Sequence, residues 1–224
     1  MGAPSMPNIT PDSWKQILAS AVEILDDLER KGFPRLDIVM GGGTVLTFRF
    51  EHRLSRDIDF FMHDVQWITL LTPRLNDTTA AMVTEYVEQP NSIKLRLPHG
   101  DIDFVVAGGV TDAHAVETLP FMNHTFPLEP TEEILAKKLF YRAAFFQPRD
   151  AFDMAAAIEF DRSAASKAVR AAASKVEIVS RRLDELAQMP PEKFERIQAL
   201  DGGKHLIGQM IAKTREFINA EAAG

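Results

Sequence analysis

Two aspartates one residue apart, Asp57 and Asp59, stand at the start of an apolar run that includes Phe60 and Phe61. The run has strand character. Alternate residues of a strand share a face, so the two carboxylates should point the same way, with Cα atoms roughly 7 Å apart. Adjacent carboxylates repel each other unless a cation lies between them. Mg²⁺ favours such hard oxygen ligands and takes its remaining ligands from water and substrate phosphates. The pair therefore predicts a site for a metal–nucleotide complex, although an isolated Asp-x-Asp would more simply be a solvated turn.

A glycine turn, composed of Gly42, Gly43 and Thr44, lies upstream of the pair, and twelve residues separate it from Asp57. A glycine turn that opens a helix offers backbone N–H groups to phosphates. Glycines also mark tight turns that bind nothing, so the turn is informative only together with the carboxylates. The combination predicts that nucleotide phosphates bind beside a divalent metal.

A third carboxylate is expected in a second apolar strand, where Asp101 and Asp103 both occur. A carboxylate in an apolar strand is unfavourable unless it is paired or binds a metal. Asp103 lies deeper in the strand, between Ile102 and Phe104, whereas Asp101 is closer to the preceding turn. Phosphoryl transfer with two metals uses a further carboxylate to hold the catalytic metal. We assign this role to Asp103 and keep Asp101 as the alternative.

Polar residues just before the aspartate pair are candidates for binding phosphate. Arg53 has the geometry to grip a phosphate with two hydrogen bonds, and Ser55 can donate to a phosphate or orient the loop. A polar surface loop explains the same residues equally well. The six histidines show no metal-ligand spacing, and we interpret His52 and His63 as incidental. Further basic residues occur in the segments connected with the site: Arg56, Lys94, Arg96, Lys137, Lys138, Arg142 and Arg149.

A later segment combines Lys138 with Arg149, Asp150 and Asp153. The two aspartates are three residues apart, so on a helix they share a face. Acids at a helix start also serve as ordinary caps, and a lysine on an apolar helix often reaches solvent along its stem. From this segment alone, helix capping and an ordinary surface lysine explain these residues better than a binding site does.

Apolar periodicity and turn residues predict the elements that position these groups. Helices are expected at 11–31, 44–50, 65–75, 131–146, from 148 onward, within 163–187, at 191–199 and at 204–221. Strands are expected at 36–40, 57–61, 81–87, 92–97, 101–106 and 121–128. Mixed α and β structure thus precedes a helical region, and we predict a boundary between 1–129 and 130–224.

Composition places the chain among ordinary globular proteins. Its 224 residues are 46% hydrophobic and carry a net charge of −7, which argues against a protein that coats nucleic acid non-specifically. It contains no cysteine, which excludes disulfides and thiolate metal sites and is typical of a cytoplasmic protein. No run of eighteen apolar residues occurs, so no membrane span is expected.

Taken together, the motifs resemble the DNA polymerase β-like nucleotidyltransferase superfamily and, within it, the AbiEii/AbiGii toxin family. The resemblance covers roughly residues 38–160. It is carried by four motifs in order: Gly42-Gly43-Thr44-Val45-Leu46, Arg53-x-Ser55-x-Asp57-Ile58-Asp59, Asp103 in its strand, and Glu133-Ile134-Leu135-Ala136-x-Lys138-Leu139 leading to Arg149-Asp150-x-Phe152-Asp153. Phe152 departs from the family's usual tyrosine, and Ala151 replaces a larger apolar residue.

The resemblance implies an α/β (α+β) fold of the polymerase β type: a small mixed sheet with flanking helices, followed by a helical C-terminal region. It implies that Asp57 and Asp59 bind metal, to which we add Asp103 as the third ligand, and that Gly43 and Thr44 hold the nucleotide phosphates. The last motif would complete the nucleotide site, through Lys138 and one or both of the aspartates Asp150 and Asp153.

The expected function is transfer of a nucleoside monophosphate from an NTP to a hydroxyl, with Mg²⁺ or Mn²⁺ as cofactor. The resemblance implies an RNA acceptor, the tRNA 3′ end in particular. It also implies a role as the toxin of a toxin–antitoxin or phage abortive-infection system, with a cognate antitoxin as partner. Two alternatives stay open: a nucleotide-binding regulator without turnover, and a glycosyltransferase that uses Asp-x-Asp to hold a metal–sugar-nucleotide. The third carboxylate and the upstream glycine turn favour nucleotidyl transfer.

Overall fold

The computed structural model describes residues 10–190, 192, 194 and 197–223. The chain forms two compact units, each built from segments that are separate in sequence. The first comprises Met1–Thr44, Ser55–Ala107 and Thr118–Pro127, and the second comprises Val45–Leu54, Gly108–Glu117 and Leu128–Gly224. The boundary at 129 stays a prediction about domains, because compactness alone does not show that a unit folds independently.

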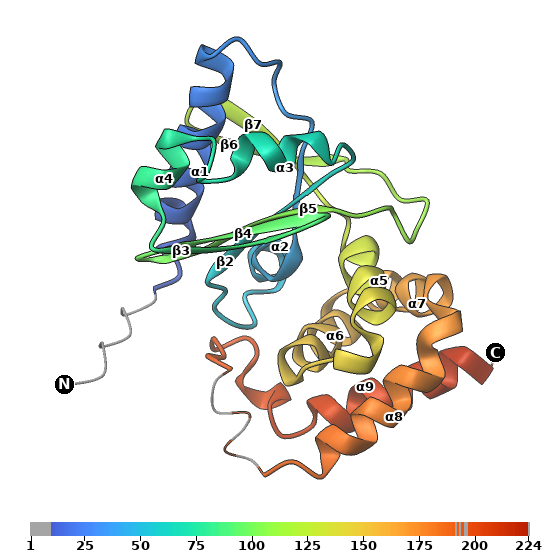
Figure 1. Ribbon diagram of the computed structural model, residues 1–224. Helices are drawn as coiled ribbons and strands as arrows, with labels where there is room; N and C mark the ends of the chain where they lie inside the picture. Colours follow the sequence, from blue (N-terminus) through green and yellow to red (C-terminus); the bar gives the residue numbers. More distant parts are fainter. Residues whose placement is uncertain (1–9, 191, 193, 195–196, 224) are drawn as a thin grey trace. The chain divides into compact units, whose positions relative to one another are not determined.

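A mixed sheet forms the centre of the first unit (Figure 1). Among the described residues it has seven strands in the order β3-β4-β5-β2-β1-β7-β6. Their bounds are β1 Val39–Gly41, β2 Asp57–Met62, β3 Glu85–Gln89, β4 Ser92–Leu97, β5 Gly100–Val106, β6 Glu117–Phe121 and β7 His124–Leu128. Strands β2 and β5 are parallel, whereas β1–β2, β3–β4 and β4–β5 are antiparallel. The mixed α/β class expected from the sequence is confirmed.

Helix α1, Ser13–Arg30, covers the apolar face of this sheet, and in Figure 1 α3 and α4 lie on the same side of β3, β4 and β5. Strand β2 alternates, with Ile58 and Phe60 fully buried and the residues between them half-buried. Phe60 stacks on Phe104 of β5 with ring centroids 5.3 Å apart. Burial of the alternate apolar residues against α1 stabilises the sheet and fixes which face the aspartates occupy.

Several local expectations differ from the structure. Helix α3, Gln66–Leu71, is shorter than expected because Thr72 precedes a proline and is extended. The strand expected from 81 begins only at Glu85, since Asn76 caps helix α4, Asp77–Met82, by accepting from the Thr79 N–H. The single strand expected at 121–128 is a hairpin of β6 and β7, whose turn contains Met122 with φ of 53°.

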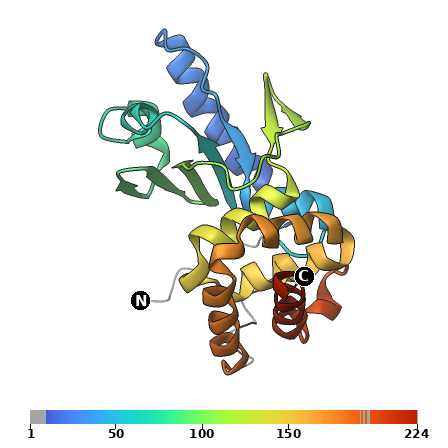
Figure 2. The same cartoon turned by 90° about the vertical axis from the view of Figure 1, so that its right-hand side faces the viewer.

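The second unit is helical apart from its connecting segments, and Figure 2 shows its helices from a second direction. Its helices are α5 Thr131–Tyr141, α6 Pro148–Phe160, α7 Arg162–Ala171, α8 Val176–Ala187 and α9 Met210–Ala223. Short 3-10 turns lie at Ala143–Phe145, Ala173–Lys175 and Lys204–Leu206. The helix expected at 191–199 includes residues 191, 193, 195 and 196, which lie outside the described part of the chain. Helix α2, Gly42–Phe50, begins in the first unit and ends in the second.

A segment near the C-terminus runs alongside His52–Leu54 in the second unit. Arg53 forms an isolated antiparallel bridge with Ala199, and the Leu54 N–H donates to the Gln198 carbonyl over 2.9 Å. A Cβ on Gly203 would lie 2.2 Å from the His52 carbonyl oxygen, so glycine is required for this close approach. The pairing fixes the backbone from which His52 and Arg53 project.

Within the residues that the structure describes, every helix is too short or too polar to cross a lipid bilayer.

Candidate functional site

Four aspartates form an array on one face of the sheet in the first unit. In the parallel pair β2–β5, Asp57 is the register partner of Asp101 and Asp59 is the partner of Asp103. Partners on neighbouring strands lie about 5 Å apart and share a face. All four are half-buried, while the residues between them face the apolar side. The structure thus brings the three predicted carboxylates together and places the alternative, Asp101, beside them.

Lys94 of β4 supplies a positive charge to this array. It is the register partner of Asp103, and its ammonium contacts the Asp103 carboxylate and lies 3.5 Å from Asp101. Burial and then the Asp59 charge raise the pKa of Asp103 to about 6, although Lys94 acts in the opposite direction. The pKa of Lys94 is raised by Asp103, Asp57 and Asp101 even though burial acts against it. The face therefore combines four carboxylates with the ammonium of Lys94.

The glycine turn lies directly against Asp59. Gly42 has φ of 70° and begins helix α2, and its missing side chain leaves the space that the Asp59 carboxylate occupies. The Thr44 hydroxyl donates to the backbone carbonyl of Asp57, which ties the first turn of α2 to the start of β2. The backbone of the turn and the carboxylates thus lie side by side within the first unit.

Replacement of Gly42 by alanine is expected to displace Asp59. The added Cβ would lie 1.8 Å from the Asp59 Oδ2 atom, in addition to about 1 kcal/mol of strain for an alanine with positive φ. The free energy of unfolding should fall by roughly 2 kcal/mol or more in urea denaturation, because a steric clash adds to the strain. Gly32→Ala is the matched control, since Gly32 has φ of 90° but nothing within 4 Å of its Cβ position. Equal losses in the two variants would contradict the contact with Asp59.

A second group of charged residues is buried in the second unit. The guanidinium of Arg53 donates from Nε to Asp153 Oδ1 over 2.6 Å and from Nη2 to Oδ2 over 2.9 Å. The Lys138 ammonium lies 3.1 Å from Asp153 and 2.9 Å from Asp150. His52 is fully buried, stacks on Phe152 and shares a 2.8 Å hydrogen bond with Asp153. We call the group of His52, Arg53, Lys138, Arg142, Asp150 and Asp153 the ionic cluster.

Asp150 has two roles in the ionic cluster. Its Oδ1 accepts from Lys138 and, over 3.2 Å, from Arg142, while its Oδ2 accepts from the Gln147 N–H in a capping box at the start of α6. The structural explanation for this residue, helix capping, is therefore observed together with the ion pair. Of the other predicted residues, Arg149 is exposed in the first turn of α6 and Ser55 is half-buried in the first unit.

The ionic cluster keeps its carboxylates ionised and its histidine neutral. Burial opposes ionisation of Asp153, but Arg53 and Lys138 hold its pKa well below the usual value. Lys138 and Arg142 likewise lower the pKa of Asp150 against the effect of burial. Burial lowers the pKa of His52, and the neighbouring cations add to this, although its bond to Asp153 acts in the opposite direction. The Nδ1 atom of His52 is buried without a hydrogen-bond partner among the described residues, which also favours a neutral ring with its proton on Nε2.

Stability should fall as the pH is lowered through the titration of His52. The ring binds its proton less readily in the folded protein than in the unfolded chain, whose pKa is near 6.5, so folding stability is fully present above that pH and is lost below it. The loss is at most about 1.4 kcal/mol per pH unit. In His52→Gln, which keeps a donor for Asp153, the free energy of unfolding should change less between about pH 8 and about pH 5. The raised pKa of Asp103 favours folding at low pH, but it affects both proteins equally. Parallel pH profiles would contradict a neutral buried His52.

The aspartate array fits a divalent metal in its chemistry more than in its present geometry. Carboxylate oxygens on one face are the donors that Mg²⁺ and Mn²⁺ prefer. Within the described residues, however, no three His, Asp or Glu side chains converge as a ligand set. Lys94 contacts Asp103 instead.

Sequence reasoning missed part of both groups. Spacing alone makes His52 incidental, whereas the structure places it in the ionic cluster. Lys94 and Arg142 were noted only as nearby basic residues, and both contact site aspartates. Each had a signal in the sequence. His52 is next to Arg53, Lys94 lies opposite Asp103 in a predicted hairpin, and Arg142 is one helical turn after Lys138.

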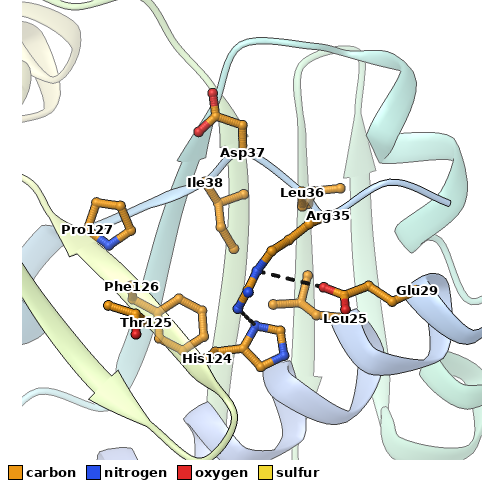
Figure 3. A pocket seen from close by; sticks show the side chains of 10 residues that line it. All are labelled: Leu25, Glu29, Arg35, Leu36, Asp37, Ile38, His124, Thr125, Phe126 and Pro127. Atoms are coloured by element: carbon orange, nitrogen blue, oxygen red, sulfur yellow. Dashed lines mark hydrogen bonds and ion pairs between the residues drawn. The ribbon is translucent and has the colours of Figure 1, made fainter.

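A separate cavity of about 190 Å³ lies in the first unit and includes none of the predicted site residues (Figure 3). Arg35 and His124 line it and are joined by a hydrogen bond of 2.6 Å from Nη2 to Nδ1. His124 also contacts Asp26 over 2.7 Å, and Arg35 lies 3.7 Å from Glu29. Asp26 and Glu29 of α1 thus contact both side chains, and the cavity has no evident part in the chemistry of the aspartate array.

Comparison with known proteins agrees with the resemblance drawn from residues 38–160. A family model described as the nucleotidyl transferase AbiEii toxin of a type IV toxin–antitoxin system matches residues 23–220. The solved structure of MenT4, a nucleotidyltransferase toxin from Mycobacterium tuberculosis H37Rv, aligns with a TM-score of 0.50 at 14% identity, covering 96% of this chain and 90% of that chain. This likeness confirms the fold. No curated protein matches the chain. The family match extends well beyond the motifs, and the chain belongs to the AbiEii family of nucleotidyltransferase toxins of type IV toxin–antitoxin systems.

Proposed function

We propose that the enzyme uses a divalent metal to transfer a nucleoside monophosphate from an NTP to a hydroxyl at the 3′ end of RNA, with tRNA as the acceptor. The observation that carries this proposal is the register of β2 and β5, which pairs Asp59 with Asp103 beside the Gly42 turn. Family membership supports nucleotidyl transfer over glycosyl transfer. The RNA acceptor is implied by the resemblance to AbiEii/AbiGii toxins.

In this proposal Asp57, Asp59 and Asp103 hold Mg²⁺ or Mn²⁺. A bound metal would lower the pKa of the acceptor hydroxyl and neutralise charge on the triphosphate and the leaving pyrophosphate. The chain's own contribution is to fix the carboxylates on a rigid sheet in register, so that little reorganisation is needed when charge develops. Lys94 would hold Asp103 ionised in spite of its burial, which keeps the carboxylate ready to act as a ligand.

The first turn of α2 is proposed to bind the triphosphate. Gly42, Gly43 and Thr44 form the start of a helix, where backbone N–H groups and the helix dipole favour negative charge. A glycine at the first position also allows a ligand to approach the backbone closely. Phosphates bound there would lie beside Asp59, where the metal is proposed.

The ionic cluster is proposed to complete the nucleotide site, together with Arg149 and Ser55. The cluster brings three cations, Arg53, Lys138 and Arg142, together around two carboxylates. These cations support binding of a phosphate, and Lys138 is the catalytic candidate because an ammonium can neutralise charge on a transferring phosphoryl group. Asp150 and Asp153 would fix the direction of these cations.

Membership of the AbiEii family indicates the general biological role of the enzyme. As a toxin of a type IV system the enzyme has an antitoxin partner. We propose that this antitoxin is encoded beside it, that the pair acts in phage defence, and that both work in the cytoplasm, where tRNA and NTPs are available.

The test is incubation of the enzyme with Mg²⁺, total tRNA and each of the four α-³²P-labelled NTPs in turn. Label on tRNA from one NTP would support the proposal and identify the nucleotide. Label on a protein band would retain the chemistry and exclude RNA as the acceptor. NTP binding by calorimetry without transfer of label to any acceptor would instead favour the nucleotide-binding regulator, and release of sugar from a sugar nucleotide would favour the glycosyltransferase.

A further inference from the structure

The end of helix α5 and the 3-10 turn after it expose aromatic side chains beside the ionic cluster. Tyr141 is 53% exposed and Phe145 is 77% exposed, which is unusual for two large rings four residues apart. Phe140, which directly precedes Tyr141, packs edge-on against it with ring centroids 5.2 Å apart. Single exposed apolar residues are common, but a group of them marks a binding surface.

Basic side chains accompany these rings. The Lys175 ammonium lies over the Phe140 ring, 5.1 Å from its centroid. Arg142 is 41% exposed and reaches Asp150 of the ionic cluster. Two acidic groups are engaged elsewhere: Asp150 is buried in the ionic cluster, and Glu185 pairs with Arg182 over 2.5 Å. We call Phe140, Tyr141, Arg142, Phe145 and Lys175 the aromatic–basic surface.

The backbone under the aromatic–basic surface is held firmly. Phe146 is fully buried, and its carbonyl accepts a 3.1 Å hydrogen bond from Arg182 Nε of α8. Phe145 closes the 3-10 turn by donating its N–H to the Arg142 carbonyl over 2.7 Å. Tyr141 is tied through its hydroxyl to the Gly108 carbonyl over 3.2 Å. The rings are therefore presented on an ordered frame, which lowers the entropy that a ligand must overcome on binding.

Aromatic rings next to cations suit single-stranded nucleic acid. Unstacked bases stack on aromatic side chains, and Lys and Arg neutralise the phosphates between them. An NTP fits less well here, because a small ligand is normally enclosed over most of its surface, whereas Phe145 is largely open to solvent. The overall charge of −7 means that a polyanion needs such a local basic surface.

We infer that the aromatic–basic surface binds the single-stranded 3′ end of the acceptor RNA, with bases stacked on Phe145 and Tyr141. This inference rests on the proposed function, since it names the surface that receives the acceptor. Lys138 lies one helical turn before Arg142, so an RNA end on this surface would approach the ionic cluster of the same unit. The surface thus joins recognition of the acceptor to the proposed catalytic lysine.

The experiment measures binding of a fluorescent hairpin RNA that carries a single-stranded 3′ overhang, with a blunt hairpin for comparison. Phe145→Ala should weaken binding of the overhang RNA about tenfold and leave the blunt hairpin unaffected, because it removes one stacking platform. Phe145→Trp, which keeps an aromatic face, should bind as the wild type does. Val116→Ala is the control, since Val116 is 89% exposed in the same unit but lies in a loop outside the surface.

Kinetics separate this inference from the proposed function. With tRNA as acceptor, Phe145→Ala should raise the KM for tRNA about tenfold and leave the KM for NTP unchanged. A wild-type enzyme that labels tRNA, with a Phe145→Ala variant that behaves identically, would overturn the surface and keep the function. A rise in the KM for NTP alone would assign the rings to the nucleotide and overturn the inference. A wild-type enzyme that labels no RNA would exclude RNA as the acceptor, and with it the role inferred for the aromatic–basic surface. Loss of a wild-type oligomer in Phe145→Ala, seen by sedimentation with RNA binding intact, would assign the surface to a protein contact.

Discussion

Asp59→Asn should lower the rate of nucleotide transfer at least about a hundredfold without weakening the fold. Asp59 lies between the Gly42 turn and Asp103, so its carboxylate is central to the aspartate array. Asparagine keeps the shape of the side chain and removes its charge. Repulsion from Asp59 contributes to the raised pKa of Asp103, so the variant should be as stable as the wild type or slightly more stable. Loss of activity combined with unchanged or increased stability is the signature of a functional charge.

The measurement combines transfer of ³²P label with urea denaturation of the same preparations. Asp37→Asn is the control, because it makes the same change at an exposed position away from the array. Activity within a few-fold of wild type in Asp59→Asn would exclude the proposed role of this carboxylate. A large loss of stability would instead show that Asp59 supports the fold.

The second large effect is expected for Asp153→Asn, as a loss of about 3–5 kcal/mol in the free energy of unfolding. Asp153 is fully buried and its carboxylate is shared by Arg53 and Lys138, both nearly buried themselves. Removing its charge leaves two desolvated cations with too little negative charge nearby, and this energetic penalty exceeds the value of the ion pairs themselves. For a chain of this length the melting temperature should fall by roughly 10 °C.

Asp184→Asn provides the comparison in the same unit. Asp184 pairs with Arg215 over 2.8 Å, but both side chains are about half exposed, and surface pairs contribute at most about 1 kcal/mol. Calorimetric melting of the two variants should therefore show a large and a small decrease. If Asp153→Asn melts within about 2 °C of the wild type, the ionic cluster is not a stability element. Its charges would then be held for the substrate alone.

The sequence determined the features that depend on local spacing. Alternation placed Asp57 and Asp59 on one face because side chains on a strand repeat every two residues. Apolar periodicity located α1 and the helices of the second unit, and the glycine turn marked the start of α2. The bounds of some elements differed from the expectation because local capping and proline effects outweighed the apolar pattern. The Asn76 cap made 77–82 helical, and Thr72 before a proline shortened α3.

The tertiary structure alone decided which distant residues meet. The register that pairs Asp59 with Asp103, and the ion pair of Arg53 with Asp153 a hundred positions away, have no local signal. The same holds for His52, whose backbone is fixed by the segment around Ala199. Local patterns specify which face of a strand or helix is apolar. Packing of those faces then selects the partners, since strand pairing and buried charge compensation are satisfied only when the whole core has formed.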